Sequence, residues 1–346
     1  MNYRVLIIQT AFLGDVILSL PVVDELRANL TDFQLDYLAI PAVANVLENF
    51  PGIDRIISYD KRKSEKSLKA FLKKVQFLKA QKYDLVLLPH RSWRSAILAK
   101  WAKIPVRIGF NKSWASFLYT HVIPYGEDVH EVNRNLSLLQ PLGIVLNKKS
   151  GLHLQINSED DTRVDAIWQA FHLNSGQPCV AIAPGSVWVT KRWFPDRFAR
   201  LIRELTAKGI QVVLIGGPAD LEVGRELQEA VPDRVVNLIG KLSPRESAEA
   251  IRRCDVLVAN DSAPVHLASA VGTKVVDIYG PTIPAFGFAP FGVNHRIVGK
   301  ELDCRPCGDH GSNKCPLRTL ECMKSISVTE VYQAVEELLN EKSKHN

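Results

Sequence analysis

The chain has 346 residues, enough for two domains of ordinary size, and its 46% hydrophobic and 23% charged residues are typical of a globular protein with sizeable cores. No apolar run reaches the length of a membrane span and no signal peptide is recognisable, so we expect a cytoplasmic protein. The net charge of +6 favours an anionic partner or an acidic membrane surface. Six cysteines in such a chain are expected as reduced thiols or metal ligands rather than as a disulfide framework.

The first half of the chain alternates apolar runs with helical patterns. Runs typical of strands cover residues 3–8, 35–40, 55–59, 84–88 and 106–109, and helical spacing of apolar residues covers 16–30, 42–50, 64–80, 92–101 and 130–142. This alternation predicts a parallel sheet that is covered by helices on both faces.

The first loop of this pattern, residues 9–15, ends in Gly14 and Asp15 immediately before a helix. Glycine permits a close approach of the backbone to a ligand. Asp15 is either a cap of the helix or a carboxylate at the carboxyl end of a central strand, where parallel sheets bind their ligands. The spacing alone leaves both interpretations open.

Two segments of the first half carry unusual positive charge. Lysines recur through residues 61–82 beside an apolar stripe. This segment is either a solvated helix packed on its own sheet or a contact for an anionic membrane or a phosphate-bearing acceptor. His90, Arg91 and Arg94 follow the strand at 84–88, at the sheet edge where Asp15 is expected. We interpret these basic side chains as a candidate acceptor site.

The pattern fades across residues 146–161, which we interpret as the boundary between two domains. A helix is expected over 162–171. The alternation then resumes, with strands at 179–183, 211–215, 235–239, 255–259 and 274–279 and helices at 198–207, 220–230 and 265–271 and another ending at 253. The second half therefore predicts another doubly wound parallel sheet.

Polar or glycine-rich loops follow the strands of the second half, and in a parallel sheet they share one edge. Lys191 supplies a cation and Ser186 a hydroxyl group, both of which suit a phosphate. Residues 260–266 place a helix N-terminus at this edge, where N–H groups and the helix dipole attract anions. Asp261 and His266 either face such a ligand or serve only the cap. The absence of a Walker lysine loop and of Gly-x-Gly-x-x-Gly argues against a standard NTPase or dinucleotide oxidoreductase.

Together these features resemble glycosyltransferase family 9, the ADP-heptose:lipopolysaccharide heptosyltransferases, over essentially the whole chain. The resemblance rests on Gly14-Asp15, on Pro184-Gly185-Ser186 followed by Lys191-Arg192-Trp193, on Leu214-Ile215-Gly216-Gly217, and above all on Asn260-Asp261-Ser262-Ala263-Pro264-Val265-His266. The cysteine-bearing tail is similar to the heptosyltransferase II branch.

The family implies an α/β fold of the GT-B type, in which two Rossmann-like doubly wound domains face a central cleft. Residues 1–155 would bind the acceptor and residues 156–326 the nucleotide-sugar. Residues 327–346 would form a helix that packs back on the first domain.

The resemblance also implies roles for individual residues. Asp15 matches the general base of an inverting, metal-independent transfer, and its place at a helix start is expected to lower its pKa and keep it ionised. Lys191 would assist catalysis by stabilising the ADP leaving group. The expected donor-binding residues are Ser186, Lys191, Glu222, Leu242, Asp261, Ser262, Ala263 and His266, and the expected acceptor-binding residues are Gly14, His90, Arg91 and Arg94.

The expected activity is transfer of heptose from ADP-heptose to the inner core of a lipopolysaccharide precursor, with no cofactor and no nucleic-acid partner. Peripheral contact with the inner membrane is left open. One alternative is another nucleotide-sugar enzyme of GT-B fold, such as an epimerase or a transferase of a different sugar. A second alternative is a non-catalytic nucleotide-sugar-binding module.

The tail contains four cysteines, at Cys304, Cys307, Cys315 and Cys322. Four thiols suffice for a structural zinc site, but the second pair lacks the short spacing of a zinc knuckle. A structural metal site and free thiols are both open interpretations, and no catalytic metal is expected.

Overall fold

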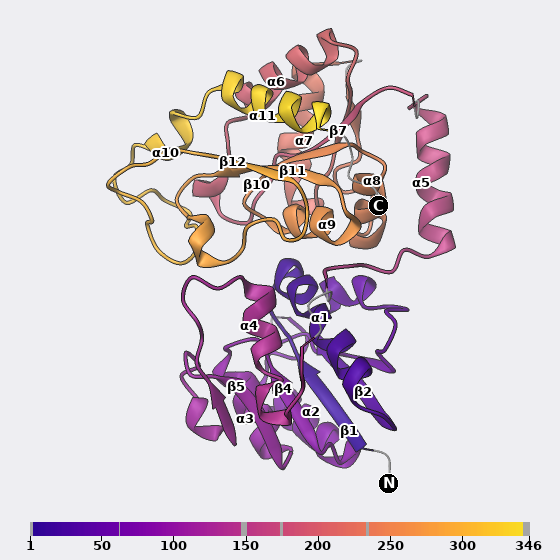
Figure 1. The fold of residues 1–346 in the computed structure, drawn as a ribbon, viewed down its shortest axis with the longest axis vertical. Coiled ribbons are helices and arrows are strands. Elements are labelled where there is room, and N and C mark those ends of the chain that lie inside the picture. Colours follow the sequence, from indigo (N-terminus) through magenta and orange to yellow (C-terminus); the bar gives the residue numbers. More distant parts are fainter. Residues whose placement is uncertain (1–2, 62, 147–150, 174–175, 233–234, 342–346) are drawn as a thin grey trace. The chain divides into compact units, whose positions relative to one another are not determined.

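A computed structural model describes residues 3–61, 63–146, 151–173, 176–232 and 235–341 (Figure 1). The chain divides into two compact units, Met1–Gln155 and Ile156–Asn346. Residues 147–150, which are part of the predicted domain boundary, lie outside the described residues. Arg62, which is part of the basic segment, also lies outside them.

The first unit is a six-stranded parallel sheet with helices on both faces. The strand order is β3-β2-β1-β4-β5-β6. Its elements are β1 (Tyr3–Ile8), α1 (Leu13–Asn29), β2 (Phe33–Ala39), the 3₁₀ helix η1 (Pro41–Val46), β3 (Arg55–Ser58), α2 (Leu68–Gln81), β4 (Leu85–Leu88), α3 (Trp93–Trp101), β5 (Val106–Phe110), η2 (Ser116–Leu118), β6 (His121–Ile123), α4 (Glu131–Ser137) and η3 (Gln140–Leu142).

The central strand β1 is apolar over four consecutive residues because both faces of the sheet are covered. Leu6 and Ile8 join the core under α2 and α3. Strand alternation places Val5 and Ile7 on the opposite face, and α1 and α4 pack against each other within this unit. The basic segment also contributes to this core, in which Phe71, Val75 and Leu78 of α2 are buried. The apolar stripe of the basic helix therefore packs largely on its own sheet.

The second unit repeats the architecture with strand order β12-β11-β10-β7-β8-β9, again fully parallel. Its elements are α5 (Ser158–Ala170), β7 (Cys179–Ala183), η4 (Val189–Lys191), α6 (Pro195–Ala207), β8 (Gln211–Leu214), η5 (Pro218–Asp220), α7 (Leu221–Ala230), β9 (Val236–Asn237), α8 (Pro244–Arg252), β10 (Val256–Asn260), α9 (Ala263–Val271), β11 (Lys274–Tyr279), η6 (Pro284–Phe286), β12 (His295–Gly299), α10 (Glu321–Lys324) and α11 (Val328–Asn340). The two sheets confirm the predicted fold class.

The C-terminal helix α11 packs on the second sheet, which corrects the expectation that it would pack on the first domain. Val331, Val335 and Leu338 recur at helical spacing and are buried in the core that α6 shares with the sheet. Lys274 Nζ on β11 donates to the carbonyls of Leu338 and Glu341, each at 2.7 Å. A cation at these carbonyls stabilises the end of the helix. The packing of the terminal helix had been inferred by analogy with GT-B enzymes, and in the structure its apolar stripe is buried in the core of the second unit.

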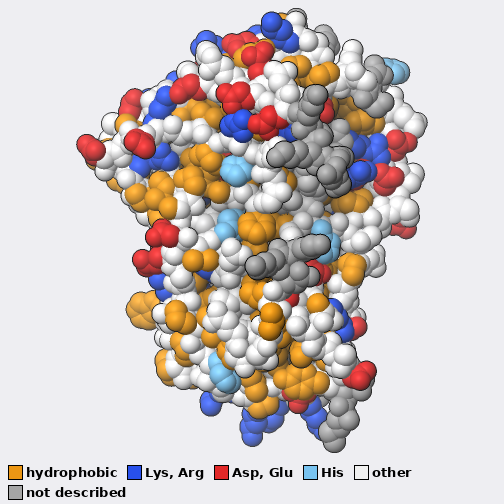
Figure 2. Space-filling model, viewed as in Figure 1, with side chains coloured by type: hydrophobic (Ala, Val, Ile, Leu, Met, Phe, Trp, Pro, Cys, Tyr) orange, Lys and Arg blue, Asp and Glu red, His pale blue; other side chains and the backbone are white. Residues whose placement is uncertain are grey.

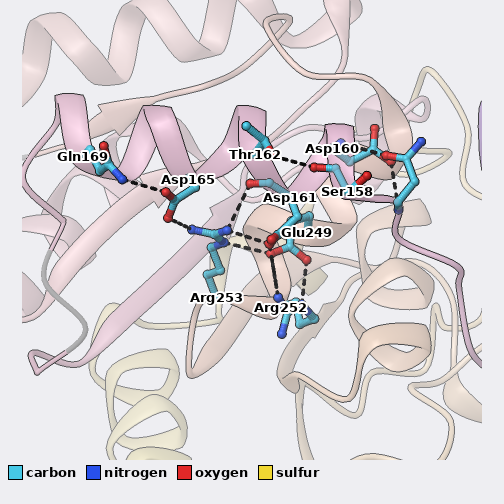
Figure 3. A network of polar contacts seen from close by, with 10 residues as sticks. Ser158, Asp160, Asp161, Thr162, Asp165, Gln169, Glu249, Arg252 and Arg253 are labelled. Atoms are coloured by element: carbon cyan, nitrogen blue, oxygen red, sulfur yellow. Dashed lines mark hydrogen bonds and ion pairs between the residues drawn. The ribbon is translucent and has the colours of Figure 1, made fainter.

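Helix α5 is attached to α8 by a network of charged side chains (Figure 3). Arg253 donates to Asp165 Oδ1 at 3.0 Å, to Asp161 Oδ1 at 2.7 Å and to Glu249 Oε1 at 2.8 Å. Helix α5 begins at Ser158, four residues before the predicted start, with Asn157 as its cap. The acidic run that suggested a loop is therefore the first turn of the helix, where negative charge is favourable.

Two edge strands, β6 and β12, were not predicted. β6 has three residues, and both strands contain exposed or half-buried positions that interrupt the apolar pattern. Edge strands pair on one side only and are commonly short, so their sequence signal is weak. No helix within the described ranges is both long and apolar enough to cross a membrane.

Candidate functional site

Each unit has a candidate site of its own, the first site and the second site, formed by the loops at the point where the strand order of its sheet reverses. The reversal lies between β1 and β4 in the first unit and between β10 and β7 in the second. Open parallel sheets bind ligands at the carboxyl ends of such strands. Asp15 follows β1 and His90 follows β4, while Ser186 follows β7 and Asp261 follows β10. Residues far apart in the sequence thus gather at one edge of each sheet.

Asp15 lies in the first turn of α1, next to the buried Gly14. Its Oδ2 accepts a hydrogen bond from the Phe12 N–H at 3.1 Å, so one carboxylate oxygen caps the helix. The side chain of Gln9 donates to the Asp15 carbonyl at 3.4 Å and links the two ends of the loop. The cap interpretation thus accounts for one oxygen of the Asp15 carboxylate.

The pKa of Asp15 is raised from 3.8 to about 6, which corrects the expectation that the helix start would lower it. Burial is the largest cause, because it disfavours the charged carboxylate, and the nearby Glu131 carboxylate adds to the effect. The Phe12 N–H and the Arg91 guanidinium lower the pKa but are outweighed. A carboxylate with such a pKa is a stronger base than an ordinary aspartate and is still mostly ionised at neutral pH.

The Glu131 carboxylate belongs to a buried cluster that the sequence did not reveal. Tyr125 OH donates to Glu131 Oε2 at 2.6 Å, and Arg134 Nη1 donates to the same oxygen at 3.1 Å. The guanidinium groups of Arg91 and Arg134 each lie 4.5 Å from the centre of the Tyr125 ring. This ring therefore orients Arg91, whose charge in turn acts on Asp15.

His90 and Arg94, both predicted acceptor ligands, have different surroundings. His90 Nδ1 lies 3.1 Å from Thr10 Oγ1, to which Lys61 Nζ also donates at 3.0 Å. These contacts bring the loops after β1, β3 and β4 together. Arg94 instead donates to Tyr59 OH at 2.7 Å and to the carbonyl of Glu65 at 3.1 Å. Arg94 therefore holds the segment before α2, and we leave it out of the proposed acceptor site.

At the edge of the second sheet, Lys191 and Asp261 form an ion pair. Lys191 Nζ donates to Asp261 Oδ2 at 2.5 Å, and Thr282 Oγ1 donates to the same oxygen at 2.6 Å. Asp261 is therefore not the cap of α9. A lysine has three N–H donors, so this pair fixes the position of the ammonium group and leaves donors for a ligand. The loop that carries Thr282 was expected at this edge, but Thr282 was not among the predicted site residues, because its contact with Asp261 depends on the tertiary structure.

The N-terminus of α9 lies beside this pair. Ser262 is the residue before the helix, and its hydroxyl donates to the Asn260 carbonyl at 2.8 Å. The backbone N–H groups of Ser262 and Ala263 donate to no group of the described residues. His266 is buried one turn further along, with its ring 6.5 Å from that of Phe288. Backbone donors at a helix N-terminus suit a phosphate.

The loop after β7 is held close to this edge. Asn260 Nδ2 donates to the Pro184 carbonyl at 2.8 Å, and the Trp193 N–H donates to Asn260 Oδ1 at 3.0 Å. Ser186 is buried, and its Oγ accepts from the Trp188 N–H at 3.4 Å. The Gly185 backbone approaches Asp220 so closely that a Cβ at this position would lie 2.0 Å from Asp220 Oδ1. Only glycine fits there without a displacement of the Asp220 side chain.

Glu222 and Leu242 lie further along the same sheet edge. Glu222 is exposed in the first turn of α7, and Leu242 is half-buried just before α8. The loop between β9 and α8 meets α7, because a Cβ at Gly240 would lie 2.9 Å from Leu221. The two predicted positions therefore belong to neighbouring segments, and no contact between them is described.

A further carboxyl group, Asp277 of β11, is fully buried near Asp261. Neither of its oxygens has a hydrogen-bond partner within the described residues. Burial raises the pKa of Asp277 well above its usual range, and the charge of Asp261 raises it further. The neutral acid is therefore the favoured form. Lys191 and Asp261 form an ion pair near this sheet edge, and the neutral Asp277 adds no negative charge to it.

The four tail cysteines line one pocket of about 180 Å³, and their loop packs on the edge that holds Lys191. Thr190 and Ser312 exchange hydrogen bonds, with Ser312 N donating to Thr190 Oγ1 at 2.9 Å, and the Arg305 guanidinium donates to the Thr282 carbonyl at 2.6 Å. Backbone N–H groups lower the pKa of Cys315, whereas burial raises that of Cys307. Where the chain is described, no three Cys, His, Asp or Glu side chains are already spaced for a metal. The metal and thiol interpretations both stay open.

Comparisons with known proteins agree with this architecture. The family model "Glycosyltransferase family 9 (heptosyltransferase)" matches residues 71–317, a range that includes the second site but not Asp15. "Lipopolysaccharide heptosyltransferase 3" of Escherichia coli is 30% identical over 282 residues, which are 78% of this chain and 82% of that protein.

Solved structures extend the similarity to nearly the whole chain. A glycosyl transferase of family 9 from Veillonella parvula has a TM-score of 0.86 at 26% identity, covering 98% of this chain and 97% of that one. The E. coli ADP-heptose lipopolysaccharide heptosyltransferase II shares the fold with a TM-score of 0.78 at 23% identity, covering 97% of this chain and 98% of that one. Heptosyltransferases 2 and 3 are both among the relatives that match this chain. The similarity of the cysteine-bearing tail to the heptosyltransferase II branch therefore stays a prediction.

Proposed function

This chain belongs to glycosyltransferase family 9, the heptosyltransferases, and from that premise we propose that it transfers heptose from ADP-heptose to the inner core of a lipopolysaccharide precursor. The observation that carries the proposal is the position of Asp15. A carboxylate with a pKa of about 6 lies at the strand-order reversal of the first sheet. The second sheet presents a lysine and a helix N-terminus at the corresponding place.

Asp15 is the general base in this proposal. It removes the proton of the acceptor hydroxyl while the hydroxyl oxygen forms a bond to the anomeric carbon of the heptose. The bond between that carbon and the diphosphate oxygen breaks in the same step, and ADP leaves with the electron pair. A single displacement of this kind inverts the anomeric configuration. The pKa of Asp15 suits this role, because the base is ionised at neutral pH and strong enough to accept the proton.

Lys191 and the N-terminus of α9 stabilise the negative charge that develops on the diphosphate. The pair with Asp261 holds the Lys191 ammonium in place before the donor binds, so little reorganisation is needed during the reaction. The backbone N–H groups of Ser262 and Ala263 provide further donors. We propose Ser186, Glu222, Leu242 and His266 as further contacts of the nucleotide-sugar, and Gly14, His90 and Arg91 as contacts of the acceptor. No metal takes part in this scheme.

The acceptor is a lipid, so the enzyme works at the inner face of a membrane. The direct test incubates the purified full chain with ADP-heptose and a heptose-bearing core lipid, and reads the lipid by mass spectrometry. We expect a mass gain of one heptose, and an inverted anomeric configuration by NMR. Consumption of the donor without any change in the lipid would favour hydrolysis or epimerisation of the nucleotide-sugar. ADP binding without turnover would favour a binding module.

A further inference from the structure

We propose that the surface formed by α2, α3 and the loop around η2 docks the enzyme on an anionic lipid bilayer. This docking face is defined by its exposed apolar side chains, which are Leu68, Leu72, Trp93, Trp101, Trp114 and Phe117. The inference rests on the proposed function in one respect, namely that the acceptor is a membrane lipid. It goes beyond that function by naming the surface that carries the enzyme to the lipid.

The exposure of the aromatic residues is the first observation. Trp114 is 93% exposed and Phe117 is 80% exposed. A single exposed hydrophobic residue needs no explanation, but several aromatic side chains on neighbouring elements indicate an interaction site. Tryptophan is also the residue that favours the interface between lipid headgroups and hydrocarbon.

The elements that carry these side chains are packed against one another, so the docking face is continuous. The ring of Trp101 contacts that of Phe71, at a centroid distance of 5.9 Å. Helix α2 packs on α3, and α3 packs on η2. On α3, Trp93, Ile97 and Trp101 are spaced by four residues and share one stripe. Figure 2 shows hydrophobic and basic side chains next to one another on the surface of the first unit.

Charge is the second observation, and it selects the partner. Residues 61–122 contain 15 Lys and Arg but only two acidic residues, Glu65 and Asp84. The whole chain has a net charge of +6, so all other residues together are net negative. Both acidic side chains of the segment are engaged: Glu65 pairs with Lys74 at 3.1 Å, and Asp84 accepts from the Arg4 N–H at 2.8 Å.

Lys112 of the docking face pairs with Glu127 at 3.1 Å, whereas the exposed lysines Lys69, Lys73 and Lys100 form no ion pair with a described carboxylate. Unpaired lysines beside exposed aromatic side chains match an anionic bilayer, which offers both negative headgroups and apolar depth. A nucleic acid would use the charge but not the mixture of leucine, phenylalanine and tryptophan. The elements of the docking face are also connected by Arg94. It donates hydrogen bonds to Tyr59 OH, just after β3, and to the Glu65 carbonyl, just before α2, and its guanidinium lies 5.0 Å from the centre of the Phe71 ring.

The test is sedimentation of the full-length protein with vesicles that contain phosphatidylglycerol, compared with vesicles of phosphatidylcholine alone. We expect binding to the anionic vesicles that weakens with salt. Replacing Trp114 and Phe117 together by serine should reduce the partition coefficient at least tenfold. The double substitution Lys69→Glu and Lys73→Glu should have a similar effect, since each lysine near such a surface contributes roughly fivefold. All four side chains are exposed, so the variants are expected to fold.

Matched controls lie in the second unit. Phe171→Ser removes a half-exposed aromatic side chain, and Lys208→Glu reverses an exposed charge there; neither should change vesicle binding. Equal binding of the docking-face variants and the controls would overturn the proposal. Loss of binding in the lysine variant alone would also overturn it, because the aromatic side chains would then take no part. Preference for a nucleic acid over anionic vesicles would point to the other class of partner.

Activity separates this inference from the proposed function. The docking-face variants should transfer heptose to a deacylated, water-soluble acceptor at the wild-type rate, and to the same acceptor in vesicles at least several-fold more slowly. Equal rates of wild type and variants on both acceptors would overturn the docking face but leave the transferase intact. Vesicle binding with no transfer by the wild type would overturn the proposed function alone.

Discussion

The raised pKa of Asp15 predicts how the rate depends on pH. If Asp15 is the base, only its ionised form is active, so activity falls as the pH drops through the folded-state pKa. With a pKa of about 6, roughly nine tenths of Asp15 is ionised at pH 7 and roughly one tenth at pH 5. We therefore expect kcat/KM to fall about tenfold between these values. With the ordinary pKa of 3.8, the fall over the same range would be negligible.

The neighbours of Asp15 allow the cause to be tested. Glu131→Gln removes a negative charge that raises the pKa of Asp15, so the acidic limb should move to lower pH. Arg91→Gln removes a positive charge that lowers this pKa, so the limb should move to higher pH.

The assay is the pH profile of kcat/KM, with Tyr125→Phe as a control that keeps both charges. The thermal unfolding of each variant should be measured as well. Glu131 and Arg134 form a buried ion pair, so Glu131→Gln could lower the stability of the protein. Shifts in the same direction in both charge variants, or no shift in either, would refute the assignment of Asp15 as the titrating base.

Three further predictions concern the second unit. Lys191→Ala should lower kcat roughly 100- to 1000-fold, as expected for a preorganised charge on the leaving group; a rate near wild type would mean that the diphosphate is stabilised elsewhere. Gly185→Ala should cost about 1–3 kcal/mol in unfolding free energy, because the new Cβ would collide with the Asp220 carboxylate, and an unchanged denaturant midpoint would contradict this. Iodoacetamide at neutral pH should modify Cys315 before the more exposed Cys307, because backbone N–H groups stabilise the Cys315 thiolate; the reverse order in mass spectrometry would contradict it.

The fold class was predictable because long apolar strands alternate with amphipathic helices at regular intervals. Strands β1, β7 and β11 were predicted to the residue, since each is buried on both faces and bounded by polar loops. The short edge strand β6 was missed because it is half exposed and has no comparable run. The position of α11 was missed because its apolar stripe indicates that it packs but not on which sheet.

The site was predictable in outline, for a different reason. In a parallel sheet all strands end at one edge, so Asp15, His90, Lys191 and Asp261 could be placed at sheet edges from the strand pattern alone. Their electrostatics could not be predicted in the same way. The pKa of Asp15 depends on burial and on Glu131, which is 116 residues away in the sequence.

The pairs within the site depend on tertiary structure as well. Thr282 shares Asp261 with Lys191 only because β10 and β11 are neighbours in the sheet. Arg94 carries a charge at a suitable position in the sequence, but the fold directs it to Tyr59 and the segment before α2. Residue type and spacing therefore indicate candidates, and the partners of each side chain decide between a structural and a functional role.

The central claim is that Asp15 removes the acceptor proton, and Asp15→Asn tests it most directly. The measurement is kcat for heptose transfer to the lipid acceptor, with ADP binding by calorimetry on the same sample. Asparagine keeps the size and the hydrogen bond of the cap but cannot serve as the base. We predict that kcat falls roughly 100- to 10,000-fold while ADP affinity is unchanged, because the second unit is untouched. A variant that binds ADP normally and turns over within a few-fold of wild type would contradict the account.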